Sequence, residues 1–341
     1  MKVSRTVIIA EAGVNHNGDM DQAKALIDVA KKAGADYVKF QTFKADKISS
    51  KLAKKATYQL EQSEEEDTQF SMLRRLELSD SDHALLKRHC EEVDIKFLST
   101  GFDLESVDKL TKYDLDFFKI PSGEITNKPL IQQVASKGLP VILSTGMANL
   151  IEIRDALDVL LENGLNKKDI TILHCNTQYP TPMVDVNLNA MLTIKNTFGV
   201  EVGYSDHTMG IEVPIAAVAL GALVIEKHFT LDRSLPGPDH KASLEPEELI
   251  SMVRSIRNIE QAMGSSNKEV SSSERPNMVV ARKSIHLSNP VTEGQRVKKD
   301  DFIMLRPGDG LSPMNFEDYI GMFYNKSLDA GHKLELDDFK A

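Results

Sequence analysis

The sequence predicts an α/β protein, a (β/α)8 TIM barrel followed by a small C-terminal domain. Short apolar runs rich in β-branched residues alternate with longer amphipathic segments over residues 1–264. A strand followed by a helix, repeated along the chain, indicates a parallel sheet with right-handed crossovers. There are eight such runs, and eight repeats in about 250 residues match a closed barrel.

The expected strands, in order, are residues 6–10, 37–40, 95–98, 117–120, 141–143, 170–174, 200–203 and 223–226. The expected helices are 20–33, 81–93, 106–110, 128–136, 150–163, 187–198 and 213–220. In the first helix Ala23, Leu26, Ile27 and Ala30 recur at helical spacing. The alternative is an open doubly wound sheet, which usually carries a G-x-G-x-x-G turn after its first strand. Residues 11–18 lack that turn, so the barrel is favoured.

Composition argues against several classes of protein. The 341 residues include 41 Lys+Arg and 51 Asp+Glu, a formal charge of −10, which speaks against nucleic acid or membrane binding along the whole surface. No apolar run approaches the roughly 18 residues of a membrane span, and no signal peptide is expected. Two cysteines, Cys90 and Cys175, provide neither a disulfide framework nor a cysteine zinc site. A cytoplasmic protein is expected.

Polar side chains crowd where the expected strands end, and a barrel places its reacting groups there. Lys39 and Lys119 each lie inside an apolar run, and a lysine facing a barrel interior needs a compensating anion. The other strand-end residues include Glu11, Gln41, Thr100, Ser122, Glu124, Ser144, Asn176, Ser205, Glu226 and Lys227. Two lysines with hydroxyls and an amide predict a cradle for a phosphate and a carboxylate on one small molecule. The alternative is that the lysines only form salt bridges with Glu11 and Glu124.

Two histidines follow neighbouring strands. His207 and His228 end the seventh and eighth strands, and adjacent strands lie about 5 Å apart. Imidazole pairs bind divalent metals and leave positions for water and substrate. Asp239, on the loop after strand eight, is a candidate outer ligand. Hydrogen-bonded core or loop histidines remain the alternative, because two histidines without a close carboxylate are only a moderate metal signal.

Ten short segments of the chain form a distinctive set: AEAGVNHNG at 10–18, VKFQTFK at 38–44, KIPSGE at 119–124, LSTGM at 143–147, HCNT at 174–177, GYSDH at 203–207, IEKHFT at 225–230, GPDH at 237–240, ARKS at 281–284 and LRPG at 305–308. Taken together, these segments resemble the sialic acid synthase family. They run in order along the chain, so the resemblance covers nearly all of it. One departure is STGFD at 99–103, where the family commonly has proline in place of Gly101. Glycine loosens φ and so makes the placement of Thr100 less certain.

The resemblance implies an enzyme that condenses phosphoenolpyruvate with open-chain N-acetylmannosamine and water, giving N-acetylneuraminate and phosphate by C–O cleavage. It implies phosphoenolpyruvate binding by Lys39, Thr100, Lys119, Ser122, Ser144, Asn176 and Ser205. It implies catalytic roles for Glu11, Glu124, Lys39 and Lys119, and sugar contacts from Glu11, Gln41, Glu124, Asp239 and Arg306. A Mn²⁺ or Mg²⁺ ion held by His207 and His228 would act as a Lewis acid on the aldehyde.

The C-terminal part is expected to be a separate module. Gly and Ser dominate residues 265–283, which indicates a linker, and short strands are expected at 284–287, 301–305 and 333–336. Residues 284–341 resemble the antifreeze-like (SAF, β-clip type) domain of sialic acid synthases. In that family the module covers the barrel mouth of the partner subunit in a domain-swapped homodimer, and Arg306 would meet the sugar's N-acyl group.

Two rival functions stay open. Legionaminic acid synthases share the barrel and the module and accept a 2,4-diacetamido-2,4,6-trideoxymannose, which would make the product N,N'-diacetyllegionaminate. A more distant alternative is a non-catalytic sugar-binding protein. A pure binder has no need to keep Lys39, Lys119, His207 and His228 together, so the enzyme is favoured.

Overall fold

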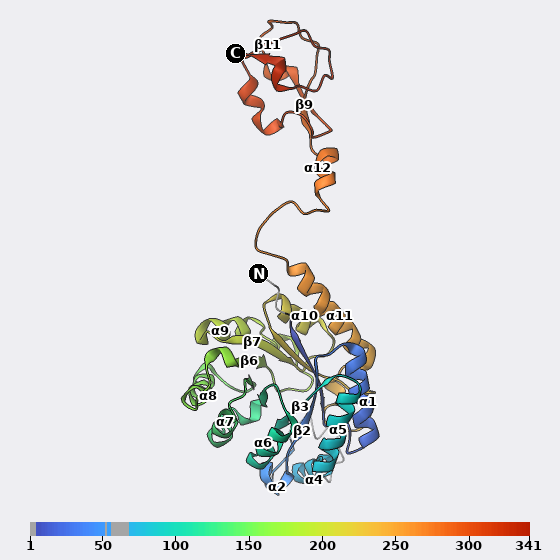
Figure 1. The fold of residues 1–341 in the computed structure, drawn as a ribbon, viewed down its shortest axis with the longest axis vertical. Helices are drawn as coiled ribbons and strands as arrows, with labels where there is room; N and C mark the ends of the chain where they lie inside the picture. Colours follow the sequence, from blue (N-terminus) through green and yellow to red (C-terminus); the bar gives the residue numbers. More distant parts are fainter. Residues whose placement is uncertain (1–4, 52, 56–67) are drawn as a thin grey trace. The chain divides into compact units, whose positions relative to one another are not determined.

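The structure is a computed structural model that describes residues 5–51, 53–55 and 68–341. The chain divides into two compact units, residues 1–264 and 265–341 (Figure 1). Within the described ranges, no helix has both the length and the apolar character that crossing a membrane requires.

The first unit is built on eight parallel strands in the cyclic order of a barrel. They are β1 (Val7–Gly13), β2 (Tyr37–Thr42), β3 (Lys96–Gly101), β4 (Phe118–Ile120), β5 (Val141–Ser144), β6 (Ile170–Cys175), β7 (Glu201–Asp206) and β8 (Val224–His228). The hydrogen-bonded order is β3-β2-β1-β8-β7-β6-β5-β4. β3 and β4 lie next to one another, but no ladder joins them in the described part of the chain. The predicted eight-stranded α/β barrel is therefore confirmed as a near-barrel.

Helices surround the strands (Figure 1). They are α1 (Met20–Ala33), α2 (Ala45–Ile48), α4 (Gln69–Leu76), α5 (Asp80–Glu92), α6 (Leu104–Leu110), α7 (Lys128–Ala135), α8 (Leu150–Glu162), α9 (Asn189–Phe198), α10 (Glu212–Ala219) and α11 (Pro246–Met263). Asp19 caps the start of α1, and Gly34 ends it with φ of 79°, which glycine adopts at little cost. Neither α4 nor α11 was among the expected helices. α11 packs against α1 and α10 and closes the ring after β8.

All strands except β4 run further at their carboxyl ends than the sequence predicts. β1 was expected to end at residue 10 and continues to Gly13, and β8 was expected to end at residue 226 and continues to His228. A break in an apolar run was taken as the end of a strand. Here Glu11 and His228 face a cavity and Lys227 binds the buried Asp206, so these polar residues stay inside the ladder.

Gly101 serves close packing rather than a loosened turn. It lies in β3, paired with Thr42 of β2, and its φ is outside the left-handed region. A Cβ at this position would lie 3.1 Å from the Cγ2 atom and from the backbone nitrogen of Val107. The glycine therefore lets α6 approach β3, and the expectation that it weakens the placement of Thr100 is not supported by this geometry.

The second unit has a small core of its own. The core residues are Ile285, Leu287, Val291, Val297, Tyr324, Leu334 and Phe339. The unit contains α12 (Arg275–Ala281) and two antiparallel pairs, β9 (Ser284–Leu287) with β10 (Phe302–Leu305) and β11 (Phe323–Tyr324) with β12 (Phe339–Lys340).

One expectation for this unit needs correction. A strand was expected at 333–336, but the structure has an isolated bridge at Lys333 and a 3-10 helix that begins at Leu336, followed by β12. The stretch 265–283, expected to be a linker, contains α12. Pro276 occupies the first turn of this helix, where its missing N–H costs nothing.

Candidate active site

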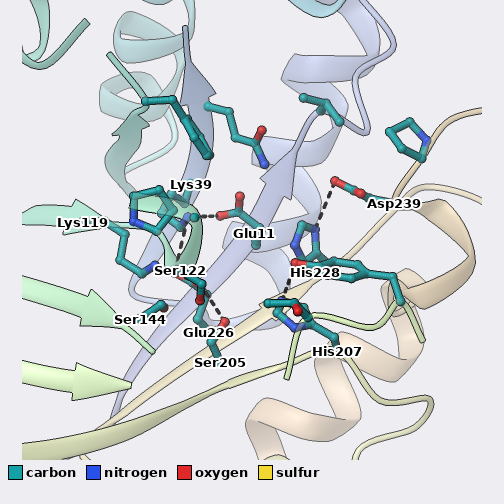
Figure 2. Close-up of a pocket in the computed structure, with 18 of the residues that line it drawn as sticks. Glu11, Lys39, Lys119, Ser122, Ser144, Ser205, His207, Glu226, His228 and Asp239 are labelled. Carbon is teal, nitrogen blue, oxygen red and sulfur yellow. Dashed lines mark hydrogen bonds and ion pairs between the residues drawn. The ribbon is translucent and has the colours of Figure 1, made fainter. Parts of the chain in front are cut away.

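A cavity of about 620 Å³ opens at the carboxyl ends of the strands, a usual size for a small-molecule site. Ten of the residues predicted for the site line it: Glu11, Lys39, Gln41, Lys119, Ser122, Ser144, Ser205, His207, His228 and Asp239. Figure 2 shows the lysines and glutamates gathered on one side and the histidines with Asp239 on the other. The barrel thus brings together groups that are far apart in the sequence.

Two buried lysines, Lys39 and Lys119, lie at the bottom of the cavity, and we call them, with Glu11 and Glu226, the lysine floor. Lys39 Nζ lies 2.8 Å from Glu11 Oε2 and 3.4 Å from Glu226 Oε2, and it donates a hydrogen bond to Thr100 Oγ1 at 2.9 Å. Lys119 Nζ lies 3.5 Å from Glu226 Oε1, an oxygen that also accepts a hydrogen bond from Ser205 Oγ. Glu226 therefore bridges the two ammonium groups.

The two carboxyl groups of the lysine floor have pKa values shifted in opposite directions. Burial raises the pKa of Glu11 to about 7, although Lys39 opposes the shift. Burial also acts to raise the pKa of Glu226, but Lys119 and Lys39 outweigh it and the pKa is lowered. Burial lowers the pKa of Lys119. Glu226 is thus the ionised carboxylate of the coupled pair, and Glu11 is the one that takes up a proton most readily.

Hydroxyl and backbone groups border the lysines. Ser144 Oγ is buried, and no protein group in the described residues forms a hydrogen bond with it. Ser122 Oγ accepts a hydrogen bond from the backbone nitrogen of Gly146 at 2.9 Å and lies 3.2 Å from Cys175 Sγ. A buried hydroxyl without a partner is costly, so Ser144 is suited to a polar ligand.

The two predicted metal ligands face one another. The rings of His207 and His228 have centroids 5.5 Å apart. His207 Nδ1 donates to the backbone oxygen of Asn176, so its neutral ring keeps a lone pair on Nε2, which accepts from the Tyr179 hydroxyl at 2.8 Å. Burial lowers the pKa of His207 to about 4 and also lowers the pKa of His228 well below its usual range, so both rings are neutral near pH 7.

This donor set fits a divalent cation. Neutral imidazoles are the form that ligates metals, and a carbonyl that fixes one ring nitrogen is a common outer partner. His228 Nδ1 is buried without a hydrogen-bond partner in the described residues, and Asp239 Oδ2 lies 3.9 Å from it. Burial raises the pKa of Asp239 to about 7. The described part of the chain contains no group of three or more histidine, cysteine or acidic residues arranged for a metal, so any ion here would also rely on water or substrate.

One wall of the cavity is apolar. It is formed by Val14, Met72, Leu73, Leu76 and Phe102, which belong to a hydrophobic cluster separate from the barrel core. Val14 follows β1, Phe102 follows β3, and the other three lie on α4. We call this set the α4 wall. The sequence reasoning missed it because α4 itself was not predicted.

Comparison with known proteins identifies the family. A model of the NeuB family matches residues 26–268. This chain belongs to the NeuB family. Among NeuB relatives, it is 50% identical to an N,N'-diacetyllegionaminic acid synthase of Campylobacter jejuni over 325 residues, 95% of this chain and 97% of that protein. It is 49% identical to one of Legionella pneumophila, with 96% of this chain and 92% of that protein covered.

A solved NeuB-type structure agrees. The sialic acid synthetase of Leptospira borgpetersenii, solved with citrate, superposes with a TM-score of 0.70 at 35% identity and covers 81% of this chain and 91% of that one. The resemblance to sialic acid synthases is therefore confirmed, and the chain is a synthase of this enzymatic family.

Some residues predicted for the NeuB site lie elsewhere. Thr100 sits beneath Lys39 and does not line the cavity. Asn176 contributes its backbone oxygen to His207, while its side chain accepts from the backbone nitrogen of Gln178. Glu124 is also outside the lining, and its carboxylate accepts from Asn127 Nδ2 at 2.6 Å. Arg306 is an exposed residue of the second unit, where its Nε donates to the backbone oxygen of Ala281.

Besides the α4 wall, Glu226 and Tyr179 line the cavity and were not assigned to the site from the sequence. Glu226 was noted only as a strand-end group, although it stands two residues before His228 and two-residue spacing puts both on one face of β8. Tyr179 lies in the loop after β6, stacked on His207 with ring centroids 4.1 Å apart. No periodic pattern marks a loop residue of this kind.

Proposed function

We propose that this chain condenses phosphoenolpyruvate with open-chain 2,4-diacetamido-2,4,6-trideoxymannose and water, and releases N,N'-diacetyllegionaminate and phosphate. The sequence alone favoured N-acetylmannosamine as the sugar. The names of the two relatives near 50% identity support the alternative substrate, so we adopt that one. Membership in a family of synthases speaks against a non-catalytic sugar binder.

The observation that carries the condensation is the pair of buried lysines beside an unpartnered serine hydroxyl. Phosphoenolpyruvate is a trianion, and Lys39 and Lys119 are 4% and 3% exposed, so both ammonium groups act in a dry environment where their attraction for the ligand is large. Ser122, Ser144 and Ser205 line the same cavity and supply hydroxyl donors for phosphate and carboxylate oxygens.

Glu11 adjusts the charge of the floor. With Glu11 and Glu226 both ionised, the two lysines are neutralised and a trianion is poorly bound. Since the pKa of Glu11 lies at about 7, binding of the anion is expected to drive protonation of Glu11. Carbon 3 of phosphoenolpyruvate attacks the aldehyde carbon of the sugar. The protonated Glu11 carboxyl can then give its proton to the aldehyde oxygen, which becomes an alcohol.

His207, His228 and Asp239 form the sugar-carbonyl side of the cavity. His207 and His228 would hold a Mn²⁺ or Mg²⁺ ion, which would supply Lewis-acid polarisation of the aldehyde oxygen. The Asn176 carbonyl fixes the His207 ring through Nδ1, and the Tyr179 hydroxyl, which lies 2.8 Å from Nε2, would give up that contact to the ion. After carbon–carbon bond formation, water adds to carbon 2 and the C–O bond to phosphate breaks, with the lysines receiving the leaving phosphate.

The α4 wall supports the deoxy sugar over N-acetylmannosamine. Two of its residues, Met72 and Leu76, are 4% and 7% exposed, and apolar side chains bind a methyl group better than a hydroxyl that would lose its water. A sugar that ends in a 6-methyl group and carries a second acetyl methyl suits such a wall.

The test is a phosphate-release assay with both aldoses, with and without chelator. We expect kcat/KM to be higher for the diacetamido sugar by 10-fold or more, since one apolar group in a pocket contributes about 1–3 kcal/mol. With ¹⁸O in the bridging position of phosphoenolpyruvate, C–O cleavage places the label in phosphate. Turnover of N-acetylmannosamine alone would overturn the choice of sugar, and no phosphate from either would overturn the synthase.

The second unit is proposed to be an SAF-type lid on the partner's barrel in a domain-swapped homodimer, with Arg306 at the N-acyl group. Its short antiparallel strands around a small core are compatible with the β-clip module, and a core of that size gains from docking. Arg306→Ala should raise the KM of the sugar more than that of phosphoenolpyruvate. Equal increases in both would count against the lid role.

A further inference from the structure

A second buried ion pair lies on the other face of β7 and β8 from the lysine floor. Lys227 Nζ lies 2.6 Å from Asp206 Oδ2, and both side chains are 0% exposed. The two residues are direct partners in the β7–β8 ladder, next to the Ser205 and Glu226 pair that lines the cavity. Because successive side chains of a strand alternate between faces, Asp206 and Lys227 point away from the substrate.

This ion pair contacts the chain segment on both sides of His207. Asp206 precedes His207 and Thr208 follows it. The Asp206 carboxylate accepts hydrogen bonds from Thr208 N and Thr208 Oγ1, each at 3.0 Å. Lys227 Nζ also donates to the backbone oxygen of Thr208. The turn that carries His207 is therefore held on both sides of the histidine by one buried cluster.

The same cluster is continuous with the strand that carries His228. Lys227 immediately precedes His228, and the β1 ladder pairs Lys227 with Ala10 and His228 with Glu11. His207 lies one residue beyond β7, so the ladder alone does not fix it. The ammonium group of Lys227, the residue before His228, thus binds the end of β7 and the residue after His207.

Stability alone does not account for a charged pair at this depth. Removing two charges from water costs several kcal/mol per ion, and well-packed apolar residues of similar volume are often as stable. What apolar residues cannot reproduce is the directed hydrogen bonding to Thr208. We propose that Asp206 and Lys227 are positioning residues that hold the His207 and His228 rings facing one another, a role that rests on the proposed metal-assisted condensation.

The test uses the full chain with the double substitution Asp206→Asn and Lys227→Met. Asparagine keeps the shape and one acceptor oxygen, and methionine keeps the length of the apolar stem. We expect Mn²⁺ affinity, measured by electron paramagnetic resonance titration, to fall by about 10-fold. This is the lower end of the loss caused by removing a direct hydrogen-bond partner of a metal ligand, because Asp206 and Lys227 act on the histidines through the backbone. kcat should fall with it, while the KM for phosphoenolpyruvate stays unchanged because the lysine floor is intact.

The matched control is Asp116→Asn with Lys96→Met, which removes a pair of the same 2.6 Å separation at the opposite end of the strands. It should leave Mn²⁺ affinity and kcat unchanged. A folded Asp206/Lys227 double variant that binds Mn²⁺ as the wild type does would overturn the proposal. If that variant does not unfold cooperatively, Thr208→Val replaces it. We expect this variant also to lose Mn²⁺ affinity, by a smaller factor. Unchanged affinity would again overturn the proposal.

A second readout separates this proposal from the proposed function. The ¹³Cε1 resonances of the nine histidines, assigned with His207→Asn and His228→Asn, report the order of the two rings without substrate or metal. If the wild type releases no phosphate and binds no Mn²⁺, the proposed function fails. The positioning role then stands only if the double variant shifts or broadens the His207 and His228 resonances and leaves the others in place.

Discussion

The two ends of the barrel carry ion pairs of very different character. At the carboxyl ends of the strands, the side chains of the Lys39–Glu11 pair are 5% and 2% exposed. At the amino ends, the Lys96–Asp116 pair is 61% and 47% exposed, although its atoms are slightly closer, 2.6 Å against 2.8 Å. Distance does not distinguish the two ends, but burial does.

The difference shows which network serves chemistry. Exposed pairs exchange water for a partner and contribute about 0–1 kcal/mol, so the amino-end network is a solvated surface. The pairs at the mouth pay a desolvation cost that their mutual attraction recovers only with good geometry. Charges kept there are available to an incoming anion, which is where a barrel enzyme needs them.

The largest expected effect is the loss of one lysine at the mouth. Lys119→Met should lower kcat/KM for phosphoenolpyruvate on the order of 10³-fold, because a charged donor in a dry site is lost. Lys96→Met at the opposite end should leave kcat/KM unchanged. Both are measured by phosphate release, and equal losses in the two variants would remove the distinction between the ends.

The next effect tests the imidazole side of the mouth. Removing the metal with a chelator, or the substitution His228→Asn, should lower kcat on the order of 10²-fold or more. This loss corresponds to the transition-state stabilisation, several kcal/mol, that a Lewis acid contributes. Added Mn²⁺ should restore the chelated enzyme but not the variant. His89→Asn is the control, because that histidine binds Asp28 on the outside of the barrel. Full activity in chelator would contradict the metal assignment.

A third variant separates packing from charge at the mouth. In Gly146→Ala the new Cβ would lie 2.5 Å from Thr177 Cγ2 and 2.9 Å from Ser122 Oγ, so both side chains must move without any change in charge. Misplacement of groups that position a substrate can lower the rate by up to about 10²-fold, and we expect about a 10-fold rise in the KM for phosphoenolpyruvate. An unchanged KM would show that neither Ser122 nor Thr177 positions this ligand.

The smallest effect concerns stability at the amino end. Hydrogen bonds from Lys96 and Tyr37 lower the pKa of Asp116 below 3.8. A lowered pKa stabilises the fold above pH 3.8, and this contribution is lost as the pH falls through the folded-state pKa. Asp116→Asn should therefore cost less than about 1 kcal/mol near pH 7 and nothing in strong acid. Urea unfolding at both pH values checks this, and a larger cost in acid would reverse the sign.

Much of the barrel could be predicted because apolar residues recur at a different spacing in its strands than in its helices. The helix at 20–33 was predicted with the bounds it has, and all eight strands were placed. Strand ends were not, because Glu11 and His228 interrupt apolar runs yet stay in the ladder, where a shared cavity satisfies them. Tertiary contacts that no local pattern shows decide such boundaries.

The candidate site shows the same division. Lys39 and Lys119 were predicted because charged groups in apolar runs need partners, and His207 and His228 because they lie at the ends of adjacent strands. Glu124 was expected beside them, but Asn127 draws its carboxylate away. The short strand β12 was missed, since two residues carry too little pattern to be recognised. The α4 wall depends on how one helix packs beside the cavity, which the sequence pattern does not reveal.

The alternation along β8 has a consequence for redesign. Three successive residues carry an acid toward the floor, a cation toward the helices and an imidazole toward the cavity. Deleting or inserting one residue in β8 would exchange all three between faces at once, whereas α4 can be altered without disturbing that register. Engineering this scaffold for a different sugar should therefore leave β8 untouched and diversify α4.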